Sequence, residues 1–540
     1  MMNPNSDTPK HFDAVVIGAG FAGMYMLHRL RTLGMSARVY EAGNNVGGTW
    51  YWNRYPGARC DVESMQYSYS FSDELQQDWV WSERYPRQEE ILKYLNHVAD
   101  RFALRTDIQF DARVTSAVYD EAKTLWTVKS VCGDTVTTVT ASFVISAMGC
   151  LSTARVPDMP GLSTFKGKWY HTGQWPHEEV DFTGKRVGIF GTGSSGIQSI
   201  PALAKLAAEV VVFQRTASFS IPAWNGPLSL EDQDAWKANY SENRAKARTT
   251  KSGIVYEYAS RAAADLTAQE VEQEYDRRWA RGGAGFMHCF TDILTSKASN
   301  DTAVKYVHNK IRGIVKDPKV ADMLCPTDHP IGAKRICVDT GYYETYNLDH
   351  VSLVDIRATP IEEIVPDGIR TTDQIHELDA IIFATGYDAV TGAIAQVDVR
   401  GKGGLVLKDK WAAGPLCYLG LMTHDFPNLF FITGPGSPSI TANVVVSIEQ
   451  HVDWIARCIE HMKGKGMTTA EANSVDEKTW VDGVNELAAK TLLPQAKSWY
   501  MGANVPGKPN VVLPYIGGLG KYTVICEEVI ADGYRGFTLN

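Results

Sequence analysis

Two glycine-rich segments of the chain have the residue types and spacing that bind the phosphates of a dinucleotide. Residues 18–23 (GAGFAG) and 191–196 (GTGSSG) both follow the pattern G-x-G-x-x-G. In such a turn the first glycine makes the tight bend, the second lets a pyrophosphate approach the backbone, and the third allows close helix packing. The candidate phosphate-binding residues are Gly18, Gly20, Phe21 and Gly23 in the first segment and Thr192, Gly193, Ser194, Ser195 and Gly196 in the second.

A residue that could bind the adenosine ribose follows each turn, at the end of the next expected strand. Glu41 ends the strand at 36–41, and its carboxylate would accept hydrogen bonds from ribose while repelling a 2′-phosphate. In the second copy Arg215 and Thr216 follow the strand at 209–214, and a guanidinium matches the shape of a phosphate. The first site therefore suits FAD or NAD, and the second favours NADPH over NADH. The alternative for Arg215 is an exposed arginine with a structural role.

The surrounding sequence supplies the elements that these turns require. Residues 12–41 and 185–215 each fit the order strand, turn, helix, strand within about 30 residues, as in a βαβ unit. Residues 107–150 alternate apolar and polar residues in short β-like runs, whereas residues 228–322 are charged, alanine-rich and helical. Further buried strands are expected at 351–356, 379–385 and 428–434. The predicted fold class is α/β, with two Rossmann-like dinucleotide-binding domains and an inserted helical subdomain.

The composition favours small-molecule partners over nucleic acid or membranes. The 540 residues carry a formal charge of −9, and the length corresponds to roughly three to four structural units. The nine cysteines include no C-x-x-C pair, which argues against a metal site or a disulfide framework. Residues 1–13 lack the apolar run of a signal peptide, and no window is apolar enough for a membrane span. We therefore expect a cytoplasmic protein without a metal, as a monomer or a weak oligomer.

The segment at 165–176 (FKGKWYHTGQWP) is the most specific motif in the chain. Its pattern F-x-G-x-x-x-H-x-x-x-W-P resembles the fingerprint of type I Baeyer–Villiger monooxygenases, which are class B flavoprotein monooxygenases. Flavin monooxygenases that oxidise nitrogen and sulfur have a similar string but usually lack its final Trp-Pro. The resemblance covers essentially the whole chain, through residues 47–61, 434–439 and 498–500. The motif residues are Phe165, Gly167, His171, Trp175 and Pro176.

The resemblance implies an oxidation that uses FAD, NADPH and dioxygen. NADPH would reduce FAD, and a flavin peroxide formed with dioxygen would insert oxygen next to a ketone carbonyl, giving an ester or lactone. Sulfide oxidation would be a side activity. Aromatic, cyclic and aliphatic ketones are all candidate substrates, and the long loop that begins at Gly434 favours the aromatic-ketone branch of the family.

The resemblance also implies roles for single residues. Arg335 matches the cation that stabilises negative charge during the reaction, and Asp61 matches the acid that positions it. Lys334 would join Arg215 at the 2′-phosphate, and Trp499 would hold the nicotinamide ribose. Further contacts with the cofactors are implied for Gly48, Thr49, Trp50, Tyr51, Trp52, Arg59, Cys60, Tyr67, Val114 and Gln198, and contacts with the substrate for Ser439, Ile440 and Thr441.

The connection between the two dinucleotide units predicts how they are joined. His171 lies in this connection, which favours a hinge role over proton transfer. The expected domains are an FAD-binding domain at 1–150 and 390–540, an NADP-binding domain at 151–225 and 331–389, and a helical insertion at 226–330.

Two other functions stay open on the sequence. A flavin monooxygenase of amines or sulfides would share the folds and the first steps, although Trp175, Pro176 and Arg335 disfavour it. A nucleotide-binding protein without catalytic activity would have to keep two intact phosphate turns as relics.

Overall fold

The computed structural model describes residues 9–540, and its larger sheet combines strands from both halves of the chain. The strand order is β17-β4-β5-β6-β1-β2-β3, and β18 also pairs with β6. Strands β4, β5 and β6 pair antiparallel, whereas the other pairings are parallel. The strands are β1 (Lys10–Ile17), β2 (Ala37–Tyr40), β3 (Ile108–Gln109), β4 (Arg113–Asp120), β5 (Leu125–Cys132), β6 (Thr135–Ser146), β17 (Asp398–Arg400) and β18 (Leu429–Phe431).

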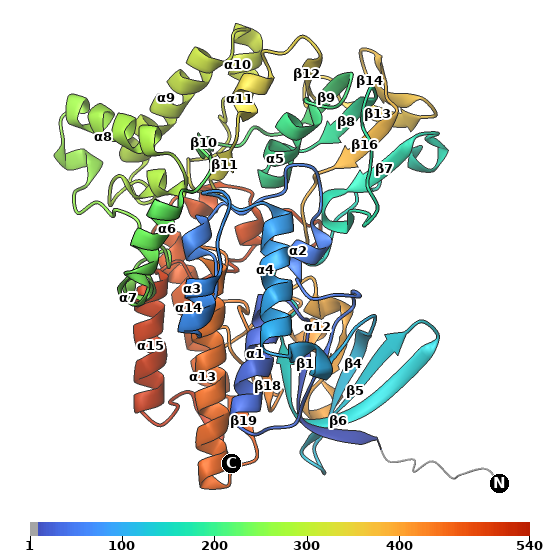
Figure 1. Ribbon diagram of the computed structural model, residues 1–540, viewed down its shortest axis with the longest axis vertical. Coiled ribbons are helices and arrows are strands. Elements are labelled where there is room, and N and C mark those ends of the chain that lie inside the picture. The colour runs from blue at the N-terminus through green and yellow to red at the C-terminus, as the bar shows by residue number, and fades with distance from the viewer. Residues whose placement is uncertain (1–8) are drawn as a thin grey trace.

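The second sheet has five parallel strands in the order β12-β9-β8-β16-β7. It lies at the upper right of Figure 1, and the larger sheet lies below it. Its strands are β7 (Lys168–His171), β8 (Arg186–Phe190), β9 (Glu209–Gln214), β12 (Val351–Asp355) and β16 (Ala380–Phe383). Short strands form three small sheets: β10 (Ser220–Pro222) with β11 (Cys337–Asp339), β13 (Ile361–Val365) with β14 (Gly368–Thr371) and β15 (Ile375–Glu377), and β19 (Ala470–Ala472) with β20 (Phe537–Leu539).

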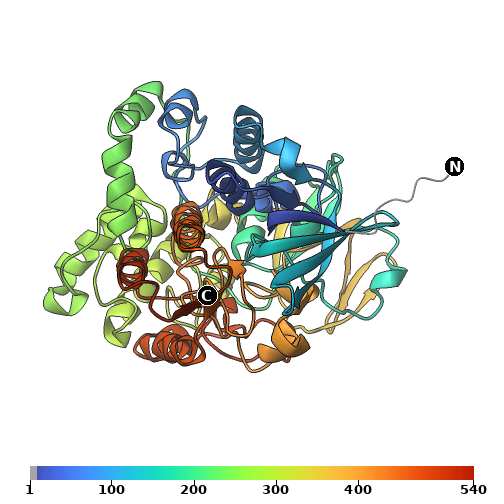
Figure 2. The ribbon, with the colours of Figure 1, turned by 90° about the horizontal axis from the view of Figure 1, so that it is seen from below.

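Helices from the two ends of the chain cover one face of the larger sheet. Helix α1 packs against α13, and α13 packs against α15, so the blue and the orange to red elements lie side by side in Figures 1 and 2. Their apolar faces share one core with the sheet. These helices and their neighbours are α1 (Phe21–Thr32), α2 (Thr49–Trp52), α3 (Asp73–Asp78), α4 (Gln88–Arg101), α12 (Leu407–Lys410), α13 (Val444–Lys465), α14 (Ser474–Ala489) and α15 (Leu519–Ala531).

The middle of the chain contributes a helical group at the upper left of Figure 1. Its side chains share a second core with the five-stranded sheet: Tyr275, Trp279 and Tyr306 belong to the same buried cluster as Val187 and Val210. Residues 268–324 of the insertion are therefore packed onto that sheet, whereas Tyr240, Ile254 and Tyr256 belong to the first core, where this earlier part of the insertion packs against α15. The helices of the insertion are α6 (Leu230–Lys237), α7 (Tyr240–Thr249), α8 (Ala268–Arg281), α9 (Lys297–Ile314) and α10 (Pro318–Leu324). Helix α5 (Ser194–Leu203) packs against β8 and β9 of the five-stranded sheet, and α11 (Tyr342–Thr345) packs against α5.

The α/β class and the two βαβ units predicted from the sequence are confirmed. One local expectation differs, because the runs expected at 135–140 and 143–147 form the single strand β6, which pairs with β5 over residues 135–141 and with β1 over residues 139–146. The expectation that residues 1–13 lack a leader falls largely on residues 1–8, outside the described chain. From residue 9 onward, no helix is both long and apolar enough to cross a membrane.

Candidate active site

The first glycine-rich turn has a shape that only glycine permits. Gly18 has φ +104°, and a Cβ there would lie 2.6 Å from the carbonyl oxygen of Ala147. A Cβ on Gly23 would lie 1.8 Å from the oxygen of Gly18. Gly20 precedes α1 and faces Gly48, whose Cα would be 3.3 Å from an added Cβ. Helix N–H groups and bare backbone therefore meet at one point, which fits the pyrophosphate of FAD.

The second turn repeats this geometry on the smaller sheet. Gly191 has φ +100°, and its added Cβ would lie 2.5 Å from the oxygen of Ala384. The Cβ of Gly196 would lie 2.0 Å from the oxygen of Gly191, whereas a Cβ on Gly193 would meet nothing within 4 Å. Space in front of Gly193, at the start of α5, is what a second pyrophosphate requires.

Glu41 reaches back to the first turn. Its two carboxylate oxygens accept the backbone N–H groups of Ala19, at 2.7 Å, and Gly43, at 2.8 Å. Burial raises the pKa of Glu41, and the backbone N–H groups oppose that rise. The residue predicted to bind ribose thus also stabilises the turn, and its carboxylate oxygens keep lone pairs that can accept a hydrogen bond from a hydroxyl.

Two of the three residues predicted for the 2′-phosphate, Arg215 and Thr216, directly follow β9. Thr192 Oγ1 in the second turn donates to the carbonyl oxygen of Thr216 at 2.7 Å. Arg215 is exposed and Lys334 is half-buried. Burial lowers the pKa of the Lys334 ammonium, and the positive charge of Arg215 lowers it further, so the two cations lie near each other.

Arg335 forms a two-point ion pair with Asp61, 274 positions earlier in the chain. Nε donates to Oδ2 at 2.7 Å and Nη2 donates to Oδ1 at 2.8 Å, while Nη1 donates to the carbonyl oxygen of Ile440 at 2.9 Å. The Asp61 carboxylate raises the pKa of Arg335 well above its ordinary value. Burial alone would raise the pKa of Asp61, but the guanidinium lowers it below its usual range.

The predicted substrate residues lie beside this ion pair. Ser439 and Ile440 are buried, and Thr441 is half-buried with its hydroxyl bonded to the carbonyl of Pro438. Ile440 packs in an apolar cluster with Leu493 and Tyr500, and Trp499 borders the same cluster. The site thus combines a fixed cation with an apolar wall.

Gln198 connects the two dinucleotide units, and the sequence assigned it only a cofactor contact. Its Oε1 accepts the hydroxyl of Tyr55 at 2.8 Å and the N–H of Arg59 at 3.3 Å. Its Nε2 donates to the carbonyl of Arg59 at 3.0 Å. A Cβ on Gly57 would lie 2.2 Å from the carbonyl oxygen of Gln198, so this loop lies directly against α5. Sequence spacing offers no signal for a contact across 139 residues.

His171 is buried and hydrogen-bonded on both ring nitrogens. Nδ1 accepts the N–H of Gly173 at 3.0 Å, and Nε2 lies 3.3 Å from Oγ1 of Thr385, which donates to the carbonyl of Arg155. Burial lowers the pKa of His171 to about 4. The nearby Tyr387, which the sequence did not single out, donates to the side chain of Asn53.

The other motif residues lie in or beside these loops. Trp50 Nε1 donates to the hydroxyl of Tyr67 at 3.2 Å, and Trp175 packs against Tyr170. Gly167 lies under the ring of Phe165, where an added Cβ would come within 2.6 Å. Buried positions are occupied by Phe21, Tyr51, Cys60 and Val114, half-buried positions by Trp52, Pro176, Ser194 and Ser195, and an exposed position by Thr49. Val114 faces the core of the larger sheet.

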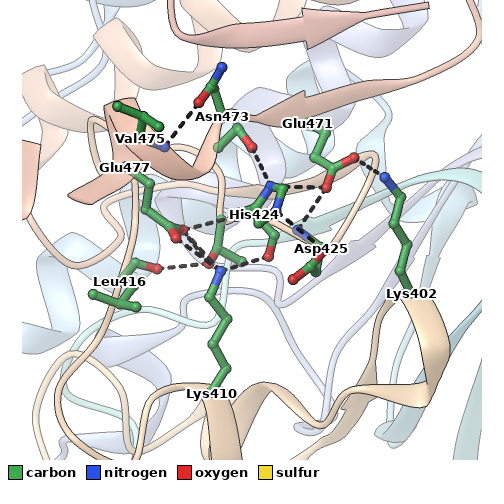
Figure 3. A network of polar contacts seen from close by, with 11 residues as sticks. Lys402, Lys410, Leu416, His424, Asp425, Glu471, Asn473, Val475 and Glu477 are labelled. Carbon is green, nitrogen blue, oxygen red and sulfur yellow. Dashed lines mark hydrogen bonds and ion pairs between the residues drawn. The ribbon is translucent and has the colours of Figure 1, made fainter. Parts of the chain in front are cut away.

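Away from this site, His424, Asp425 and Glu471 form the one group of potential metal ligands found among residues 9–540 (Figure 3). Lys402 already pairs with Glu471, and the backbone N–H of Asp425 donates to it at 2.8 Å. His424 Nδ1 faces the carbonyl oxygen of Ala472 at 3.0 Å. These contacts form a polar network that attaches the loop at His424 and Asp425 to β19. The absence of a metal stays a prediction.

Comparisons with known proteins identify the family. Residues 12–225 match the family described as FMO-like, flavin-binding monooxygenase-like. A Baeyer–Villiger monooxygenase of Pseudooceanicola batsensis is 44% identical over 527 residues, 97% of this chain and 95% of that protein. A solved steroid monooxygenase bound to NADP has 50% identity and a TM-score of 0.94, covering 98% of this chain and 99% of the other. The OTEMO complex with FAD and NADP has 41% identity and a TM-score of 0.94, covering 99% and 100%.

The two phosphate turns and the matches over nearly the whole chain lead to the same conclusion. This chain belongs to the Baeyer–Villiger monooxygenases, and it is an FAD-containing, NADPH-dependent enzyme that inserts an oxygen atom from dioxygen next to a ketone carbonyl.

Proposed function

We propose that Arg335, held by Asp61, is the cation that stabilises the negative charge developing on the ketone oxygen during oxygen insertion. The two-point ion pair is the observation that carries this proposal, since it fixes the guanidinium plane in one orientation. FAD, when bound at the first turn, supplies the chemistry that activates dioxygen. Arg335 keeps its proton throughout because Asp61 raises its pKa well above the ordinary value.

The substrate class follows from the surroundings of the guanidinium. An uncharged ketone needs one polar contact for its carbonyl and apolar surface for its body. Arg335 would provide the polar contact for the carbonyl. The cluster of Ile440, Leu493, Tyr500 and Trp499 would provide the apolar surface for the body of the ketone. The solved relative named for steroids agrees with ring-containing ketones as substrates.

Cofactor contacts are proposed for both nucleotides. Glu41 and the turn at 18–23 would hold FAD, while the turn at 191–196 with Arg215 and Lys334 would hold NADPH. His171 is proposed as a positioning residue between the units, because a buried, neutral imidazole with both nitrogens engaged is suited to structure and not to proton transfer.

The test replaces Arg335 with alanine and with lysine. Anaerobic bleaching of the flavin absorbance by NADPH should remain in Arg335→Ala, while lactone formation from cyclohexanone, followed by product mass, should be lost. Arg335→Lys should recover little, because a lysine cannot make the two-point contact. Arg400→Ala, which breaks an exposed pair with Asp398, is the control. Ester formation near the parent rate in Arg335→Ala would exclude the proposed role.

A further inference from the structure

A second arginine stands at the end of the strand next to β9. Strands β9 and β12 are parallel neighbours, and their last pair is Gln214 with Asp355. The N–H of Ile356 then donates to the carbonyl of Gln214 at 3.0 Å. Two residues beyond the pair, Thr216 and Arg357 lie side by side. In parallel sheets the carboxyl ends of the strands are where ligands bind.

Arg357 is held in place by two contacts. Its Nη2 donates to the hydroxyl of Thr216 at 2.6 Å and to Oδ2 of Asp328 at 3.0 Å. The other oxygen of Asp328 contacts Nδ1 of His329 at 2.6 Å, which fixes the carboxylate. Across residues 9–540, both side-chain contacts of Arg357 use Nη2, so Nε and Nη1 have no hydrogen-bond partner. The side chain is 53% exposed, so these donors can meet a ligand from solvent.

The local charges favour an anion such as a phosphate monoester. Arg215, Lys334 and Arg357 carry three positive charges. Asp328 and Asp355, whose carboxylate accepts the backbone N–H of Arg357 at 2.9 Å, carry two negative charges, which leaves a positive surplus of about one. A phosphate monoester carries about −1.5 to −2 at neutral pH. Arg357 binds Thr216, the residue next to Arg215, at 2.6 Å, which places the two arginines at the same end of the sheet. Burial lowers the pKa of Lys334, Asp328 opposes this shift, and the positive charges of Arg215 and Arg357 add to it.

We propose that Arg357 is a specificity-determining residue that binds the 2′-phosphate of NADPH together with Arg215 and Lys334. The inference rests on the proposed 2′-phosphate site and adds to it a residue from a different strand. Thr216 and Asp328 act as positioning residues, because they hold one face of the guanidinium and leave Nε and Nη1 for the phosphate oxygens.

The experiment compares Arg357→Ala with the parent in the FAD-loaded enzyme. Calorimetry measures binding of adenosine 2′,5′-bisphosphate and of adenosine 5′-monophosphate, which differ only in the 2′-phosphate. We expect about tenfold weaker binding of the bisphosphate, the size of a partly exposed charge-assisted contact, and unchanged binding of the monophosphate. The ratio of kcat/KM for NADPH to that for NADH should fall by the same factor.

The controls separate this inference from the site on which it rests. Arg370→Ala removes a half-buried arginine of β14, paired with Glu363, and should change neither ligand's affinity. If Arg215→Ala loses discrimination while Arg357→Ala keeps it, the role of Arg357 is wrong and the proposed site stands. If both variants keep the parent's preference for the bisphosphate over the monophosphate, the role of Arg357 and the proposed 2′-phosphate site are both wrong. Equal weakening of both ligands in Arg357→Ala and in Arg357→Gln would show a purely structural role and overturn the inference.

Discussion

Replacing Asp61 by asparagine tests the ion pair with little change in volume. Asp61 accepts two hydrogen bonds from Arg335, at 2.7 and 2.8 Å, and the third donor of the guanidinium goes to Ile440. Asparagine keeps one acceptor oxygen and places an NH₂ group where the second carboxylate oxygen was. That group would face a donor of Arg335, so one of the three contacts is lost and the guanidinium is held less firmly by the two that remain.

The expected cost follows from the contacts and their exposure. A charge-assisted hydrogen bond contributes about 1.5–3 kcal/mol. The side chains of Arg335 and Asp61 are 32% and 19% exposed, so water screens the pair and the lower part of that range applies. We take about 2 kcal/mol, which corresponds to roughly a thirtyfold lower rate of ester formation.

The pH dependence of this loss has a definite sign. Arg335 holds the pKa of Asp61 below its usual range, so the carboxylate is charged at every pH above about 4. The ion pair is therefore complete in the folded enzyme at neutral pH, and its contribution disappears only as the pH falls through the lowered pKa. Between pH 6 and 9 the parent and Asp61→Asn should differ by a constant factor.

The assay measures anaerobic reduction of the flavin by NADPH and, separately, ester formation at saturating ketone. Reduction should be close to the parent rate in Asp61→Asn, and ester formation should fall. Asp398→Asn removes a carboxylate that accepts from Arg400 at 2.9 and 3.0 Å on the surface, and should affect neither. Ester formation within twofold of the parent, or an equal loss in reduction, would refute the reasoning.

Three further predictions concern His171, two buried tyrosines and two glycines of the second phosphate turn. Burial lowers the pKa of His171 to about 4, so below its ordinary pKa the unfolded chain takes up a proton that the folded chain does not. As the pH falls from about 6.5 to 4, the parent should therefore lose about 1.4 kcal/mol of unfolding free energy per pH unit more than His171→Gln. Equal dependence of the unfolding free energy on pH in the two proteins, measured by thermal unfolding, would contradict this. Tyr522→Phe removes a hydroxyl that donates to a backbone carbonyl at 2.5 Å and should cost about 1–3 kcal/mol in denaturant unfolding, whereas Tyr256→Phe removes a buried hydroxyl without a partner among residues 9–540 and should cost little. Gly193→Ala should fold normally, because its Cβ enters the open space proposed for the pyrophosphate, and should bind NADP⁺ less tightly by calorimetry. Gly196→Ala should be unstable, because its Cβ would lie 2.0 Å from a carbonyl oxygen. Normal NADP⁺ affinity in Gly193→Ala would place the pyrophosphate elsewhere.

The two phosphate turns could be predicted because their steric demands are local. Gly18 and Gly23 meet each other within one turn of chain, and Gly191 and Gly196 do the same. Residue spacing alone therefore carries the signal. The backbone groups that leave no space for a side chain at Gly18 and Gly191 are not local, since they belong to Ala147 and Ala384, which follow the distant strands β6 and β16.

Contacts between distant segments could not be derived in this way. Periodicity predicts which residues face a core, but says nothing about which polar side chains meet across 100 or more residues. The pairing of Arg335 with Asp61 came only from resemblance to a family. For Arg357 the sequence lacks only one piece of information. It predicts strands at 209–214 and 351–356, but it does not give their register, and the register is what places Thr216 beside Arg357.

The contacts of Gln198 suggest why two separate dinucleotide units can serve one reaction. Helix α5 begins at the second phosphate turn, and Gln198, one turn along it, binds Tyr55 and Arg59 from the other unit. Arg59 is two residues from Asp61, which orients Arg335. A displacement of α5 would therefore act on the guanidinium through one side chain and two peptide units. The links are hydrogen bonds at Gln198 and at Asp61, joined by two peptide units, so the start of α5 and the guanidinium are connected by a few short contacts.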